Sequence, residues 1–271
     1  MRSLTLLALT MALFAAACSS TPKNEKTADQ PVDVLYNQAA AAMDAQDYSK
    51  ASRLFQEVER QHPYSEWAVR AELMASFAAY QGGQYDEAII GLERFIELHP
   101  GSKDIDYALY LKSLCFYEQI SDVTRDQMMT REALNGFDTL INRYPDSLYA
   151  RDATLKRDLT LDHLAGKEME IGRYYLNRGQ INAAINRFRN VVKNYQTTTP
   201  TPEALHRLVE AYMTLGLKNE AYKVAAVLGY NYPGSSWYRD TYKLMDDEQR
   251  QRLKDDQSFI DRTINSLLKP D

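Results

Sequence analysis

Four short strings, each containing a proline, recur along the chain and divide most of it into units. They are His62-Pro63-Tyr64-Ser65, His99-Pro100-Gly101-Ser102, Tyr144-Pro145-Asp146-Ser147 and Tyr232-Pro233-Gly234-Ser235. Each string follows one amphipathic run of helical period and precedes another. Proline cannot continue a helix, and the serine after it can cap the next helix. The strings therefore predict a series of helices that end at fixed places.

Each unit also carries an alanine at one fixed offset before its proline. These alanines are Ala51, Ala88, Ala133, Ala184 and Ala221, and in the fourth unit Gln196 stands where the proline is expected. An apolar residue follows four positions later, as Phe55 follows Ala51. Small residues let two antiparallel helices approach closely, and the residue at i+4 lies on the same face. The pattern resembles the tetratricopeptide repeat, although the early tryptophan of that repeat is absent.

The repeat predicts an all-α fold, an α-solenoid of about five tetratricopeptide-like helix pairs over residues 32–268. One helix pair cannot bury its own apolar face, so neighbouring pairs must stack. Trp237–Met245 and Gln249–Leu268 have helical periodicity and are expected to form C-terminal capping helices. Two intervals between the alanines are longer than the others. The first predicts an elaborated loop at Ser121–Asp126, and the second predicts one long helix over 148–178.

The N-terminal residues have the order of a lipoprotein export signal. Arg2 precedes a short apolar run, and small residues and Cys18 follow it. The run is too short for a helix that spans a bilayer. Ala16-Ala17-Cys18 resembles a bacterial lipobox, so we predict a signal peptide over 1–17, then a lipidated Cys18 and a disordered polar tether over 18–31. The alternative is a secreted protein cleaved at an A-x-A site, in which Cys18 has no such role.

The sequence contains no pattern for catalysis or metal binding. The net charge of −5 disfavours nucleic acid, which requires clustered Lys and Arg. His62 and His99 occupy a position that Tyr144 and Tyr232 fill in other units, which indicates packing and capping rather than zinc binding. Cys115 lies in an apolar helical run and is expected to be buried. We predict a non-enzymatic protein with no metal and no cofactor besides the covalent lipid.

Aromatic residues are concentrated on the first helix of each of the first three units. If these helices line the concave face, as in tetratricopeptide proteins, seven side chains follow one substrate groove: Tyr36, Leu73, Phe77, Tyr80, Tyr107, Tyr110 and Tyr117. The corresponding residues of the fifth unit are polar: Glu203, His206 and Glu210. An aromatic groove suits an extended peptide with apolar or aromatic side chains, and the difference predicts two partners. The alternative for each aromatic residue is packing between helices.

Several features together resemble the BamD family of outer-membrane assembly lipoproteins over nearly the whole mature chain. They are the lipobox, the tether, the five repeats, Ile105-Asp106-Tyr107, the loop Asp122–Asp126, Arg173-Tyr174-Tyr175, Arg178-Gly179 and Ala184-Ile185-Asn186-Arg187. The resemblance implies a subunit of the β-barrel assembly machinery. Such a subunit is lipid-anchored in the inner leaflet of the outer membrane and faces the periplasm, and Ser19 after the cysteine fits this destination.

In that family the C-terminal repeats bind the barrel subunit, and the N-terminal repeats receive unfolded outer-membrane proteins. The resemblance therefore implies that Arg187, with Arg173 and Tyr174, contacts a BamA-type barrel subunit, and that other assembly-machinery subunits are further partners. The alternative for Arg187 is a solvated helix arginine. Two other functions are a pilotin-type or other periplasmic tetratricopeptide adaptor lipoprotein, and a helical-solenoid cell-wall enzyme such as a lytic transglycosylase. The enzyme is disfavoured because residues after the solenoid leave no room for a catalytic domain.

Overall fold

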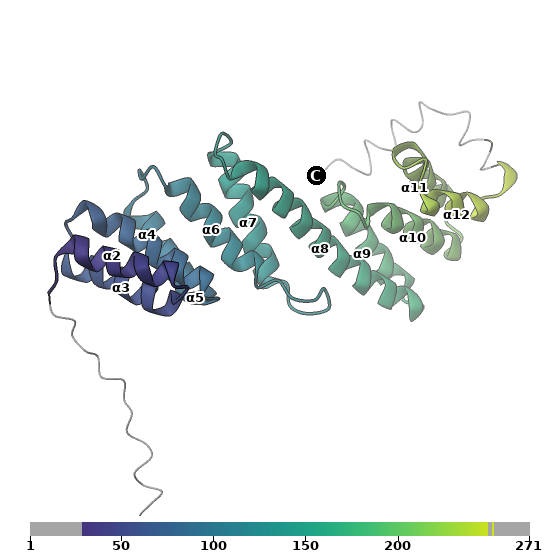
Figure 1. Cartoon of the computed structure of the whole chain (residues 1–271). Helices are drawn as coiled ribbons and strands as arrows, with labels where there is room; N and C mark the ends of the chain where they lie inside the picture. The colour runs from purple at the N-terminus through teal and green to yellow at the C-terminus, as the bar shows by residue number, and fades with distance from the viewer. Residues whose placement is uncertain (1–28, 249–250, 252–271) are drawn as a thin grey trace, which may run out of the picture.

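The computed structural model describes residues 29–248 and residue 251, and these residues form eleven α-helices and no strand. The helices are α2 (Val32–Asp44), α3 (Tyr48–Gln61), α4 (Glu66–Gln81), α5 (Tyr85–Leu98), α6 (Ile105–Tyr117), α7 (Met128–Arg143), α8 (Ala150–Asn177), α9 (Ile181–Asn194), α10 (Thr201–Thr214), α11 (Lys218–Asn231) and α12 (Ser236–Leu244). They follow one another along an elongated row (Figure 1). The all-α prediction is confirmed.

The helices form five pairs that stack in chain order. The pairs are α2/α3, α4/α5, α6/α7, α8/α9 and α10/α11, and the second helix of each pair contacts the first helix of the next. The first helices also touch one another along the row, from α2 through α4, α6 and α8 to α10. Each pair thus contacts mainly its neighbours, as in a repeat solenoid.

The repeated alanines lie where the helices of a pair approach. Ala51, Ala88, Ala133, Ala184 and Ala221 are all fully buried. The residues four positions later, such as Phe55 and Phe188, are also fully buried. Both results agree with the physical reason given for the pattern, because a larger side chain at the alanine position would separate the two helices.

Within four of the five pairs, a tight turn joins the helices through one residue with positive φ. These residues are Gln46, Gly83, Gly179 and Gly216, with φ between 58° and 73°. Glycine adopts this left-handed conformation without the steric cost that a Cβ brings. The third pair has residues 118–127 in place of the tight turn, which confirms the elaborated loop predicted there.

The second helix of each pair ends at an equivalent aromatic or histidine residue. His62, His99, Tyr144, Tyr195 and Tyr232 are the C-caps, and their φ angles lie between −134° and −124°. The His62 Nε2–H donates to the Gln30 carbonyl at 2.7 Å, and the Tyr232 hydroxyl donates to the Gln196 carbonyl at 3.0 Å. The predicted packing and capping role of His62 and His99 is confirmed.

In two of the four proline-containing strings, the serine caps the following helix as predicted. Ser65 caps α4 by accepting from the Ala68 N–H at 3.2 Å, and Ser235 caps α12 by accepting from the Trp237 N–H at 3.1 Å. Ser102 and Ser147 accept N–H groups just before their helices begin, so they fix the approach to the helix rather than its first turn.

The long helix is confirmed as α8, whose 28 residues extend from the third pair into the fourth. Its first half packs on α7 and its second half packs on α9. At about 1.5 Å per residue it is roughly 42 Å long. It therefore provides one continuous helix that contacts the second helices of both the third and the fourth pair.

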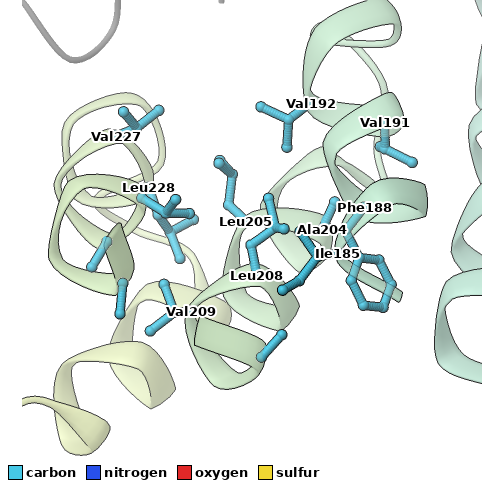
Figure 2. Packing of buried hydrophobic residues seen from close by; sticks show 14 of the residues in the cluster. Ile185, Phe188, Val191, Val192, Ala204, Leu205, Leu208, Val209, Val227 and Leu228 are labelled. Carbon is cyan, nitrogen blue, oxygen red and sulfur yellow. The ribbon is translucent and has the colours of Figure 1, made fainter. Parts of the chain in front are cut away.

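The buried side chains form three clusters along the row. One contains Leu35 and Phe55, the second contains Leu92 and Phe137, and the third, between α8 and α12, contains Phe188. Figure 2 shows how side chains from α9, α10 and α11 meet in the third cluster. The predicted signal peptide, Cys18 and most of the tether lie outside the described residues, as does most of the second capping helix, whereas the first capping helix is present as α12.

Candidate binding surfaces

Four of the seven predicted groove residues meet on the first helices of the second and third pairs. The Phe77 and Tyr107 ring centroids are 6.4 Å apart, and Tyr149, in the turn before α8, lies 5.1 Å from Tyr107 and stacks on Tyr110 at 5.0 Å. Tyr80 lies close enough to Tyr107 and Tyr110 to interact with them electrostatically, and its ring centroid lies 5.9 Å from that of Tyr85. We call Phe77, Tyr80, Tyr107, Tyr110 and Tyr149 the aromatic surface. All five are partly buried, so part of each side chain remains accessible.

The aromatic surface is bordered by carboxylates. The Tyr110 hydroxyl donates to the Asp152 carboxylate, which also accepts from the Lys156 ammonium at 2.6 Å. Burial raises the pKa of Tyr107 to about 12, and Tyr149 adds to this effect. Burial, and secondarily Glu118, also raises the pKa of Tyr80. The phenols therefore remain neutral near pH 7 and offer apolar rings with hydroxyl donors to a ligand.

The other three predicted groove residues lie in different surroundings. Tyr36 is only 8% exposed and packs between Phe55 and Trp67, and Leu73 is 7% exposed in the core. Tyr117 packs edge-on against Phe137, a fully buried core residue. Tyr36 and Leu73 follow the packing alternative, whereas Tyr117 is partly buried and has the Lys156 ammonium 6.0 Å from its ring. The accessible aromatic surface is therefore shorter than the predicted groove.

Tyr149 lies outside the helix positions that predict the groove, but the sequence carries a signal for it. An aromatic residue stands four positions after the proline in three of the four strings: Trp67, Tyr149 and Trp237. Each of these rings packs on the first helix of the preceding pair: Trp67 on Tyr36, Tyr149 on Tyr107 and Trp237 on His206. The position therefore connects one first helix with the next.

Arg187 lies in a cleft of about 400 Å³ between α8 and α9, which also contains Tyr175 and Asn190. Its guanidinium donates to both carboxylate oxygens of Glu168, at 3.4 and 3.2 Å. The Arg187 side chain is 41% exposed and the Glu168 side chain is 17% exposed. Arg187 is therefore oriented by a partner in its own chain and still accessible to a ligand.

Arg173 and Tyr174 face away from that cleft, so the three predicted contact residues do not form one cluster. The Arg173 guanidinium donates to both oxygens of Glu203 on α10 at 3.1 Å, and to Glu170 at 3.1 Å. Tyr174 is half exposed, with the Arg178 guanidinium 4.7 Å above its ring.

The polar residues of the fifth pair attach α12 to α10. His206 is 5% exposed, its Nδ1 lies 2.7 Å from the Thr241 hydroxyl, and its ring lies 5.2 Å from the ring of Trp237. A hydrogen bond from His206 lowers the pKa of Glu210 to about 2, burial opposes this effect, and Arg207 contributes a second hydrogen bond. His206 is therefore an internal contact of the helix row and not part of an open polar groove.

The buried side-chain amide of Gln127 helps to hold the elaborated loop of the third pair against α8. The Gln127 side chain donates to the Arg125 carbonyl at 3.0 Å and accepts from the Thr130 hydroxyl at 3.0 Å. Its oxygen lies 2.9 Å from the His163 Nδ1, and the Lys167 ammonium donates to the Thr124 carbonyl at 2.7 Å. These contacts fix the position of the loop on the long helix.

Cys115 is fully buried, and burial raises the pKa of its thiol to about 12, which confirms the packing interpretation. Among the described residues, no group of His, Cys, Asp and Glu side chains is arranged to bind a metal ion. The described helices also include none that is long and apolar enough to cross a membrane.

Comparison with known proteins gives one consistent result. The family described as "YfiO: Outer membrane lipoprotein" matches residues 28–228. "Outer membrane protein assembly factor BamD" of Caulobacter vibrioides is 49% identical, over 90% of this chain and 81% of its own length. The Rickettsia prowazekii protein of the same name is 46% identical, over 89% and 96%, and that of Neisseria meningitidis serogroup A is 34% identical, over 85% and 91%.

Proposed function

Because the chain belongs to the BamD family of YfiO-type outer membrane lipoproteins, we propose that it is a non-enzymatic assembly factor for outer membrane proteins. The observation that carries this proposal is the continuous similarity, which extends through the five helix pairs and so includes both candidate surfaces. No specific observation favours a pilotin-type adaptor or a cell-wall enzyme.

The two surfaces have different chemistry and suit different partners. The aromatic surface presents neutral phenols and rings, which fit an extended segment of an unfolded outer-membrane protein with aromatic or apolar side chains. The Arg187 cleft presents a guanidinium, which fits a carboxylate on a folded partner. We assign the first surface to unfolded substrate and the second to a BamA-type barrel subunit, with the other assembly subunits as further partners.

In this proposal, lipid on Cys18 anchors the chain in the inner leaflet of the outer membrane. Several acyl chains on one residue give stable anchoring, whereas a single chain binds only marginally. The residues between Cys18 and α2 would then hold the helix row on the periplasmic side.

Replacement of Arg187 by glutamate tests the barrel-subunit assignment. Arg187→Glu places a second carboxylate beside Glu168 and removes the guanidinium that a partner carboxylate would bind. We expect at least tenfold weaker co-purification of the barrel subunit from detergent-extracted membranes, equivalent to about 1.4 kcal/mol. Arg189→Glu is the matched control, because Arg189 is exposed on the same helix.

Circular dichroism of both variants verifies that the helix content is unchanged. Equal co-purification by the two variants would contradict the assignment of the Arg187 cleft. A photoreactive residue at Tyr80 is expected to capture unfolded outer-membrane protein, and one at Arg187 the barrel subunit. Capture of the same partner at both positions would contradict the division into two surfaces.

A further inference from the structure

The first half of α8 exposes two leucines beside a cleft of about 430 Å³. Leu155 is 60% exposed and Leu159 is 57% exposed, and the two lie one turn apart on the same face of the helix. The cleft is completed by Asp158 and Asp162 of α8 and by residues 197–199, which join α9 to α10. It shares no lining residue with the aromatic surface or with the Arg187 cleft. Exposed apolar side chains that are grouped in this way indicate a contact site.

The walls of this leucine cleft are fixed by hydrogen bonds. The Asp162 carboxylate accepts from the backbone N–H of Thr199 at 2.8 Å and from its hydroxyl at 2.7 Å. The Thr198 hydroxyl donates to the Tyr195 carbonyl at 2.6 Å. The connection between α9 and α10 is thus attached to α8 before any ligand arrives, which lowers the cost of binding.

The charges around the leucine cleft are mainly negative. Its two charged lining residues are Asp158 and Asp162. The Asp158 carboxylate forms an ion pair with the Arg157 guanidinium at 2.8 Å. The Asp162 carboxylate accepts hydrogen bonds from neutral groups of Thr199. On the adjacent helix α7, Asp138 adds a third carboxylate, and its pKa is raised by burial and by Asp158, although Arg157 opposes this. An occupant should therefore combine apolar side chains with a positive charge.

Residues 252–271 of the same chain contain apolar residues and four basic residues, together with four aspartates. Leu253, Ile260, Ile264 and Leu267 recur at helical spacing and give one apolar stripe if the segment is helical, and Lys269 follows closely. A stripe of this kind must be buried against another surface to contribute to stability.

The chain also has the length to reach the leucine cleft. After α12, the Asp246 carboxylate lies 3.6 Å from the Lys218 ammonium, so the chain has returned to the turn between α10 and α11. From there, the cleft lies at the other end of α10, whose 14 residues span roughly 21 Å. Twenty residues cover about 30 Å even when they are fully helical.

We propose that residues 252–271 return along α10 and place Ile264 and Leu267 in the leucine cleft, with the Lys269 ammonium beside Asp158 and Asp162. The segment then connects the end of the last pair with the first half of α8, in addition to the direct contact between α10 and α8. Such a contact would add to the stacking between the fourth and fifth pairs.

Disulfide trapping tests the position of the segment. Leu155→Cys is combined with Leu267→Cys in the full chain, and the matched control combines Leu98→Cys with Leu267→Cys. Leu155 and Leu98 are both 60% exposed, and Leu98 lies on α5 in the second pair. In dilute solution under mild oxidation, we expect a rapid intramolecular disulfide for the first pair of substitutions and none for the control. Equal rates, or a disulfide between two copies of the chain, would overturn the proposal.

Thiol accessibility gives an independent readout in case the disulfide geometry is unfavourable. With Leu155→Cys alone, deletion of residues 252–271 is expected to increase the alkylation rate severalfold, and Ile264→Asp with Leu267→Asp in the full-length chain should do the same. Lys269→Glu should give a smaller increase through its charge. The rate at Leu98→Cys should not change in any of these backgrounds. An unchanged rate at Leu155→Cys after the deletion would refute the contact.

Discussion

At the scale of single residues, two glycines of α8 differ in the space that is available for a side chain. A Cβ at Gly172 would lie 2.4 Å from the Phe188 ring, which is fully buried and cannot retreat. A Cβ at Gly166 would meet only Val123, at the ordinary contact distance of 3.5 Å. Gly172 is therefore required by packing against α9, whereas Gly166 is not.

The two glycines predict effects of opposite sign. Alanine favours a helix over glycine by about 1 kcal/mol, so Gly166→Ala should stabilise the protein by up to that amount. At Gly172 the same gain is outweighed by overpacking, which typically costs about 1–3 kcal/mol, so Gly172→Ala should destabilise it. Urea denaturation of both variants measures the difference. A stabilised Gly172→Ala variant would contradict the close contact with Phe188.

The sequence was sufficient to predict which residues are buried in the repeat pattern, but not which polar residues are paired. The alanines and the residues at i+4 follow from one local rule. By contrast, Glu72 is 4% exposed and accepts from Arg94 at 2.9 Å, although the two residues are 22 positions apart. The pairing of Arg187 with Glu168 likewise depends on how α8 and α9 pack together. Such pairs are determined by helix packing and leave no local spacing in the sequence.

At the scale of helices, local signals located most ends, and the exceptions have physical reasons. Proline and the left-handed turn residues mark the ends directly. The polar residues of α10 led us to expect an open polar groove in the fifth unit, because the position of α12 relative to α10 could not be read from spacing. His206 and Trp237 are in contact only because α12 folds back onto α10.

The attachment of α12 predicts a dependence on pH. The pKa of Glu210 is lowered from 4.5 to about 2, so its charged form stabilises the fold fully above about pH 4.5, and this contribution is lost as the pH falls towards 2. Glu210→Gln should therefore be less stable than the parent protein near pH 7 by roughly 1–2 kcal/mol, a range reduced for partial exposure. Thermal unfolding at several pH values should show that the difference in stability between the two proteins disappears between pH 4.5 and 2. A gap that is constant over this range would contradict the role of the Glu210 charge.

At the scale of the whole molecule, three separate hydrophobic clusters indicate that stability is local. Phe55 belongs to the cluster of the first pair and Phe188 to the cluster of the last pairs, and both are fully buried. In a solenoid, each repeat is stabilised by its own packing and by its neighbours. The number and order of the repeats could be predicted from the sequence, whereas the division into three clusters could not.

Truncation of either phenylalanine should therefore have a regional effect. Phe55→Ala and Phe188→Ala each remove a buried ring, at a cost of about 3–5 kcal/mol to the surrounding cluster. Hydrogen exchange should accelerate in α2–α4 for the first variant and in α8–α11 for the second. Uniform acceleration along the whole row in both variants would show that the clusters unfold together.

The continuous helix α8 determines how the two candidate surfaces are oriented. Asp152, which borders the aromatic surface, and Glu168, which pairs with Arg187, both belong to it. Sixteen residues separate them, equivalent to roughly 24 Å along the axis and about 160° around it. The surfaces thus point to nearly opposite sides of a single rigid element. Partners bound at the two surfaces would consequently not overlap, so one need not leave before the other binds.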